Sequence, residues 1–222
     1  MEQTVYSLPL IGDPAPSFKA VTTKGVINYP EDYKGKWSIL FSHPADFTPV
    51  CTTEFMTFAK RHQEFRDLNT ELVGLSVDAL QSHIQWLRSL EDFEYRGIKN
   101  AKVDFPLIVD ITMEVSRLYG MIHPNADATH AVRAVFIVDP KGIIRTIFYY
   151  PASAGRNFDE LIRIVQALQY SDKHKVATPA DWQPGDDAIL PPPATTAAAI
   201  DRMNDKEAKC QDWYFCFKEI KE

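Results

Sequence analysis

Residues 44–54 of the chain read PADFTPVCTTE, and this stretch joins a predicted strand to a predicted helix. The apolar residues 39–42 indicate a buried strand, and prolines at 44 and 49 stiffen the loop that follows it. A helical pattern begins almost at Cys51, so we expect its sulfur at a helix N-terminus. Unpaired N–H groups and the positive end of the helix dipole favour a nucleophilic thiolate there.

The alternative for Cys51 is a buried cysteine that only fills the core. A packing thiol needs neither a proline-braced loop nor a helix N-terminus. The same helix also carries larger apolar side chains at helical spacing, namely Phe55, Phe58, Phe65 and Leu68. We therefore interpret Cys51 as reactive. Thr48, three residues upstream, offers a hydroxyl that can hydrogen-bond the sulfur or an oxygen bound next to it.

The spacing of Pro44, Thr48 and Cys51 matches the active-site signature PxxxTxxC of the peroxiredoxins. The longer string at 41–54 resembles the one-cysteine-type ("six") subfamily. The resemblance continues at residues 8–16 (LPLIGDPAP), 104–106 (DFP), 133–140 and 150–160, in the same order. It therefore covers most of the chain.

Composition limits the class of protein and its partners. With 222 residues, a net charge of −6 and a pI of about 5.5, we expect one domain plus an arm, and no nucleic-acid partner. No apolar run is long enough for a membrane span, and no secretory signal is visible. Three cysteines do not suit the disulfide framework of a secreted protein, so we expect a cytoplasmic protein in which any disulfide is transient.

Short apolar runs alternate with amphipathic stretches, which is typical of an α/β domain. The predicted strands are residues 39–42, 72–77, 106–109, 134–138 and 143–149, and the last two are joined by a tight turn at 139–142. A helix between the strands at 72–77 and 106–109 should bury Ile84, Leu87 and Leu90. A closing helix after the last strand should bury Leu161, Ile164, Val165 and Leu168. With the resemblance, this order predicts a thioredoxin-like fold with a C-terminal extension.

Composition changes near residue 170, so we expect a peroxidase domain at 1–170 and an arm at 171–222. Prolines interrupt the start of the arm, and residues 194–208 look helical. Four aromatic side chains then lie close to Cys210 and Cys216. A solvated tail would not carry so much apolar area, and the family precedent is an arm that docks on the partner subunit.

Four further residues are site candidates. Arg133 borders an apolar run, where it either pairs with a charge or reaches solvent from the strand end; the resemblance implies that it binds the sulfur and the peroxide. Arg156 matches a second family arginine, or is a solvated residue before a helix. Glu54 lies in the first helical turn, where it caps the helix dipole or holds an arginine. His43 matches a family histidine, although a structural role is the commoner one. No metal-ligand spacing is present, and we expect no metal and no cofactor.

The resemblance implies a thiol peroxidase in which Thr48, Arg133 and Pro44 shape the site around Cys51. Peroxide, hydrogen peroxide or an alkyl hydroperoxide, would convert Cys51 to a sulfenic acid. The Cys210/Cys216 pair resembles the tail of archaeal-type thioredoxin peroxidases, which implies that Cys216, with Cys210 as the alternative, resolves it to a disulfide. A thioredoxin-like dithiol would reduce this disulfide.

The same resemblance implies a homodimer that assembles into a decameric ring. A ring-forming holdase chaperone and a one-cysteine peroxidase without internal resolution are the alternatives. The second, lipase-type site of some subfamily members is not expected, because residues 34–38 read KGKWS and Pro30 replaces the histidine.

Overall fold

The computed structural model describes residues 8–220. They form two compact units, and the boundary between the units along the chain lies between Phe158 and Asp159. We predicted a boundary near residue 170, whereas helix α4 (Phe158–His174) belongs almost entirely to the second unit. None of the helices in the described range is long and apolar enough to cross a bilayer.

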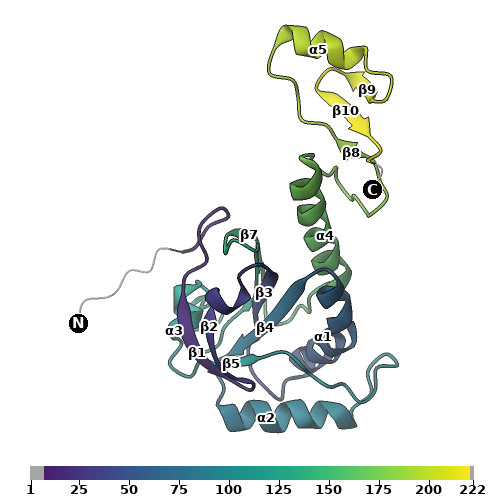
Figure 1. Cartoon of the computed structure of the whole chain (residues 1–222). Helices are drawn as coiled ribbons and strands as arrows, with labels where there is room; N and C mark the ends of the chain where they lie inside the picture. Colours follow the sequence, from purple (N-terminus) through teal and green to yellow (C-terminus); the bar gives the residue numbers. More distant parts are fainter. Residues whose placement is uncertain (1–7, 221–222) are drawn as a thin grey trace, which may run out of the picture. The chain divides into compact units, whose positions relative to one another are not determined.

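The first unit is built on a seven-stranded mixed sheet with the strand order β2-β1-β5-β4-β3-β6-β7 (Figure 1). Strands β3, β4 and β5 run parallel, and the other neighbouring pairs are antiparallel. This mixed sheet confirms the predicted α/β class. The strands are β1 (Phe18–Thr22), β2 (Gly25–Tyr29), β3 (Trp37–Ser42), β4 (Thr70–Ser76), β5 (Leu107–Val109), β6 (Arg133–Val138) and β7 (Ile144–Tyr150).

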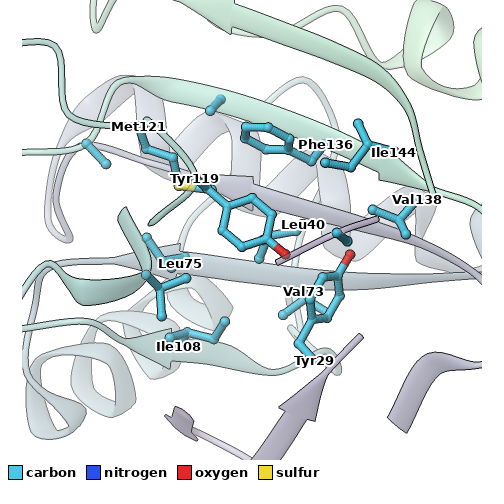
Figure 2. Packing of buried hydrophobic residues seen from close by; sticks show 14 of the residues in the cluster. Tyr29, Leu40, Val73, Leu75, Ile108, Tyr119, Met121, Phe136, Val138 and Ile144 are labelled. Atoms are coloured by element: carbon cyan, nitrogen blue, oxygen red, sulfur yellow. The ribbon is translucent and has the colours of Figure 1, made fainter. Parts of the chain in front are cut away.

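Strand β3 is buried along its whole length, because it lies between two neighbours and is covered on both faces. Successive side chains of a strand point to opposite faces, so Leu40 and Phe41 enter different cores. Leu40 belongs to a cluster with Val73, Tyr119 and Phe136, and Figure 2 shows this packing. That cluster also takes in Val115 of the short helix α3 (Glu114–Leu118).

The opposite face of the sheet is covered by α1 (Pro49–Asp67) and α2 (Leu80–Ser89). Phe41 stacks on Phe58 of α1 with ring centroids 4.2 Å apart. Phe55 of α1 in turn packs on Trp86 of α2, at 4.7 Å. Aromatic rings therefore fix α1, and with it the start of the helix where Cys51 lies.

All five predicted strands are present, and the last two form the predicted antiparallel hairpin. The hairpin of β1 and β2 was not predicted, because its side chains alternate between partly buried and exposed and give no continuous apolar run. The predicted buried face of this helix is correct for Leu90, which is completely buried just after α2 (Leu80–Ser89), and wrong for Ile84. Ile84 is 45% exposed, whereas His83 and Trp86 are buried. Two 3-10 turns, η1 (Glu31–Tyr33) and η2 (Leu90–Asp92), complete this unit.

In the second unit, α4 is followed along the chain by one more helix and by a three-stranded sheet with the strand order β8-β10-β9. The helix α5 (Thr196–Met203) is shorter than the predicted 194–208, and the Thr195 hydroxyl accepts a bond from the Ala198 N–H at its start. Cys210 and Cys216 face each other across the hairpin and form a disulfide. The strands are β8 (Ala188–Ile189), β9 (Lys209–Asp212) and β10 (Phe215–Lys218).

Candidate active site

Cys51 is the third residue of α1, after the N-cap Thr48, the proline at the first helical position and Val50. This confirms the predicted placement of the sulfur in the first helical turn. Cys51 is completely buried and is the free cysteine among the described residues. The Thr48 hydroxyl donates to the Ala45 carbonyl oxygen at 2.8 Å, which leaves its own oxygen free to accept a hydrogen bond.

Arg133 is brought to the sulfur by the register of the sheet. Val135 of β6 pairs with Phe41 of β3, and Arg133 lies two residues earlier on the same face, the one that α1 covers. Its Nη1 donates to Cys51 Sγ at 3.2 Å and to Glu54 Oε2 at 2.7 Å. Its Nε and Nη2 both donate to the Ala152 carbonyl oxygen, at 3.2 and 2.7 Å. Arg133 is therefore a buried, partnered residue and not a strand-end arginine in solvent.

Glu54, one helical turn after Cys51, joins the two arginines. Arg156 donates to Glu54 Oε1 from its backbone N and its Nε, and to Oε2 from Nη2, at 2.8, 2.9 and 2.5 Å. Burial acts to raise the pKa of the Glu54 carboxyl, but Arg156 and then Arg133 outweigh it and hold this pKa below its ordinary value. Glu54 is therefore a buried carboxylate between two buried guanidinium groups.

The charges of this cluster are not balanced by its own carboxylate. Two guanidinium groups and one carboxylate leave one positive charge in a buried region, and Arg133 directs one of its N–H groups at Cys51 Sγ. The cluster therefore holds a cation against the sulfur of Cys51.

A second polar network lies beside the loop that leads to Cys51. His43 Nε2 contacts Asp46 Oδ1 at 3.0 Å, and His83 Nδ1 contacts Asp46 Oδ2 at 2.8 Å. Burial lowers the pKa of His43 below its ordinary value in spite of the bond to Asp46. Polar atoms of His43, Asp46 and Asp78 lie within 4.8 Å of one another. Their contacts are hydrogen bonds to protein donors, and we assign no metal role to them.

The structure thus brings together Cys51, Glu54, Arg133 and Arg156, with His43, Thr48 and the half-buried Pro44 on the adjoining loop. The other two candidates, Cys210 and Cys216, lie in the second unit as a disulfide.

Sequence reasoning missed three contributors, which are Asp46, His83 and the Ala152 carbonyl group. Asp46 stands inside residues 44–54, next to the residues that were recognised. At His83, the only indication in the sequence was a polar residue flanked by the apolar residues of a predicted helix.

Comparisons with known proteins show which family the chain belongs to. A family profile described as the AhpC/TSA family matches residues 11–147, and one described as the C-terminal domain of 1-Cys peroxiredoxin matches residues 167–206. A protein from Methanosarcina mazei named "Peroxiredoxin" is 60% identical over 214 residues, which cover 95% of this chain and 98% of that protein. The chain belongs to the peroxiredoxin family. This peroxiredoxin is therefore a peroxidase that uses cysteine chemistry, as the resemblance implied.

Two solved structures show the same fold as this peroxiredoxin. The yeast mitochondrial 1-Cys peroxiredoxin superposes with a TM-score of 0.83 at 40% identity, over 96% of this chain and all of that one. A cysteine-to-serine mutant of peroxiredoxin 6 from Arenicola marina also gives 0.83, at 32% identity, over 96% of this chain and 99% of that one. These matches confirm the thioredoxin-like fold with a C-terminal extension.

Proposed function

We propose that Cys51 is the sulfur that reacts with peroxide, and the observation that carries this proposal is the 3.2 Å bond from Arg133 Nη1 to Cys51 Sγ. The thiolate attacks the terminal peroxide oxygen, the O–O bond breaks, and the leaving hydroxide or alkoxide takes up a proton. The products are a Cys51 sulfenic acid and water or an alcohol. Hydrogen peroxide and alkyl hydroperoxides are both substrates in this proposal.

The surrounding groups have distinct roles in this step. Arg133 donates to the sulfur and then to the oxygen on which negative charge develops. The Thr48 oxygen accepts the peroxide O–H, since its own proton is donated to Ala45. Pro44 shapes the loop, while Glu54 and Arg156 hold Arg133 in place and His43 supports the same loop.

Resolution by the C-terminal cysteines is the second part of the proposal. The Cys216 thiol condenses with the Cys51 sulfenic acid, which releases water and forms a Cys51–Cys216 disulfide. The Cys210 thiolate then attacks Cys216, which frees the Cys51 thiolate and leaves a Cys210–Cys216 disulfide. The pairing of Cys210 with Cys216 supports this second exchange. A thioredoxin-like dithiol reduces the pair and completes the cycle.

We further propose a cytoplasmic homodimer, assembling into a decameric ring, in which the arm of one subunit serves the Cys51 of the other. Exposed apolar side chains support a docked arm: Trp213 and Tyr214 are 42% and 56% exposed in the single chain. Ile200 and Met203, in the same unit, are also exposed. Trp213 and eight residues between Pro193 and Asn204, Ile200 and Met203 among them, also line a cavity of about 630 Å³.

Labelling with dimedone after one equivalent of hydrogen peroxide tests the first part. Mass spectrometry should find dimedone on Cys51 before either C-terminal cysteine, and peroxide consumption should stop in Cys51→Ser. Faster labelling of Cys210 or Cys216 would contradict the assignment. A Cys51→Ser protein that still prevents aggregation of client proteins as well as the wild type would add the holdase function.

Non-reducing gels of single cysteine variants test the second part. Cys210→Ser should stop after the first exchange and accumulate the Cys51–Cys216 disulfide. Cys216→Ser should form no such disulfide and should over-oxidise Cys51 to sulfinic acid. If neither substitution changes the products, the protein is a one-cysteine enzyme that depends on an external thiol. The yeast mitochondrial 1-Cys peroxiredoxin, whose thiol is resolved via glutathione/thioredoxin systems, is a structural neighbour of that kind.

A further inference from the structure

The network around Asp46 holds one histidine in an unusual setting. Asp46 accepts from three side chains, through Oδ1 from His43 Nε2 at 3.0 Å and through Oδ2 from His83 Nδ1 and Ser82 Oγ, both at 2.8 Å. Burial acts to raise the pKa of Asp46, but the hydrogen bonds from His43 and His83 outweigh it and lower this pKa to about 2. Asp46 is therefore a carboxylate, which can only accept hydrogen bonds.

Both ring nitrogens of His83 face acceptors. Nδ1 lies on the Asp46 carboxylate, and Nε2 lies 3.1 Å from the carbonyl oxygen of Ile108, in β5. A neutral imidazole has one N–H and one lone pair, so one of these contacts would set a lone pair against an acceptor in the protein interior. Turning the ring over would place C–H groups at both acceptors. Only a ring with a proton on each nitrogen satisfies both partners.

His43 differs from His83 in the same network. Its Nε2 bonds Asp46, but its Nδ1 has no hydrogen-bond partner among residues 8–220, so one proton on Nε2 satisfies His43. The charged groups that face the two rings are carboxylates. Asp46 lies on the loop after β3, and Asp78, on the loop after β4, accepts from the Asp46 backbone N at 2.9 Å. The direct contact with the Asp46 carboxylate compensates for the burial of the imidazolium charge on His83.

The loop that Asp46 anchors is strained. Phe47, the next residue, has a left-handed backbone with φ of 55°, and its side chain is 59% exposed. Such a conformation is unfavourable for a residue with a side chain and persists only where neighbouring contacts hold it. Thr48 follows as the N-cap of α1. Any shift at Asp46 therefore moves Thr48 and the first turn that carries Cys51.

We propose that His83 is a positioning residue which, protonated on both ring nitrogens, holds the active-site loop in its reactive conformation through Asp46. The inference rests on the proposed role of Cys51 as the peroxide-reacting sulfur. His83 touches neither the sulfur nor the peroxide. It acts by tying residues 43–48 to α2 and to the carbonyl group of β5.

The proton count on His83 is measured directly by NMR of the reduced, full-length protein labelled with 15N-histidine. At pH 7 both ring nitrogens of His83 should give protonated signals, assigned by their loss in His83→Asn, and His43 should show one protonated and one bare nitrogen. A bare nitrogen on His83 at pH 7 would overturn the proposal. This readout does not involve peroxide, so it stands apart from any failure of the Cys51 assignment.

The positioning role is measured by the rate of Cys51 sulfenic acid formation. His83→Asn retains a neutral donor toward Asp46 and His83→Gln retains one toward Ile108, and both lose the charge. Either variant, shown to be folded, should react slower by on the order of tenfold to a hundredfold, as expected for a misplaced catalytic turn. Ser82→Ala is the matched control, because it removes an uncharged donor from the same carboxylate oxygen. Equal losses in Ser82→Ala and His83→Asn, or a wild-type rate in either His83 variant, would overturn the proposal.

Discussion

Arg133 and Arg156 both bind Glu54, but the hydrogen bonds of Arg156 run only to that carboxylate and to the carbonyl oxygens of Ser42 and Ala134 within the described chain. Arg133 also reaches Cys51 Sγ. Two residues of the same type, both buried and joined to the same partner, therefore occupy different chemical positions. Arg133 contacts the reacting sulfur, whereas Arg156 stabilises the cluster through Glu54.

Methionine substitutions should separate these two positions. Arg133→Met removes the donor to the sulfur and should slow peroxide reduction by on the order of a hundredfold or more. Arg156→Met leaves Glu54 with one cation and two carbonyl groups without their donor, so it should lower the free energy of unfolding by about 3 kcal/mol and affect the rate less. Stopped-flow kinetics and urea denaturation measure the two effects. Equal rate losses in folded forms of both variants would refute the distinction.

Asp46 gives a pH-dependent prediction. Its pKa of about 2 in the folded protein lies below its ordinary value of 3.8, so the stability it contributes is present above about pH 4 and is lost as the pH falls toward 2. Between pH 5 and pH 3 this contribution should fall by about 1 kcal/mol. Asp46→Asn should lose less stability than the wild type over this interval, as measured by urea denaturation at each pH. Parallel curves for the two proteins would contradict the assignment.

At the scale of elements, the close packing of β3, β4 and β5 against one another and against α1 positions the site. Gly74 of β4 lies between β3 and β5, and a Cβ atom placed there would lie 3.0 Å from Leu107 Cδ1 and 3.2 Å from Phe41 Cζ. Phe41 stacks on Phe58 of α1, so the absence of a side chain at position 74 lets the helix approach the sheet.

Gly74→Ala should therefore destabilise the protein by roughly 1–3 kcal/mol through overpacking. The second substitution Phe41→Leu, in the Gly74→Ala background, removes ring atoms from the crowded space and should cost less than the same change in the wild type. A double-mutant cycle in urea denaturation measures this coupling. Additive effects would show that the two residues do not compete for the same space.

At the scale of the whole molecule, the proposed catalytic cycle needs chain segments that are far apart in sequence. Cys51 lies in the first unit, and the Cys210–Cys216 disulfide lies in the second. Disulfide exchange requires two sulfurs to come within bonding distance. Because Cys51 is completely buried, the first turn of α1 or the loop before it must open locally before a second sulfur can reach it.

Subunit mixing tests whether the exchange occurs between chains. Cys51→Ser and Cys216→Ser should each be inactive in turnover with a dithiol, since each lacks one of the two reacting sulfurs. If the arm serves the partner subunit, heterodimers of the two variants contain one complete pair, and peroxide turnover should return. Mixed samples that form heterodimers by native mass spectrometry and remain inactive would place the exchange within one chain.

The sequence by itself predicted the features that depend on nearby residues. The strand before residue 44, the helix at Cys51 and the hairpin of β6 and β7 all follow from local periodicity and from proline and turn signals. The resemblance supplied the family, and the same local patterns suggested an apolar arm. Local patterns failed at α2, where a buried polar residue, His83, is paired from another element and so does not follow hydrophobicity.

Only the tertiary structure decided the partners of the charged residues. The sequence left Arg133 between a solvent-facing strand end and a site residue, and the pairing of β6 with β3 resolved this by placing it against Cys51, 82 positions away. The same holds for Arg156 on Glu54 and for His83 on Asp46, which are 102 and 37 positions apart. A buried charge is tolerated only where a partner neutralises it, and strand order and register, which no local pattern specifies, determine which partner is near.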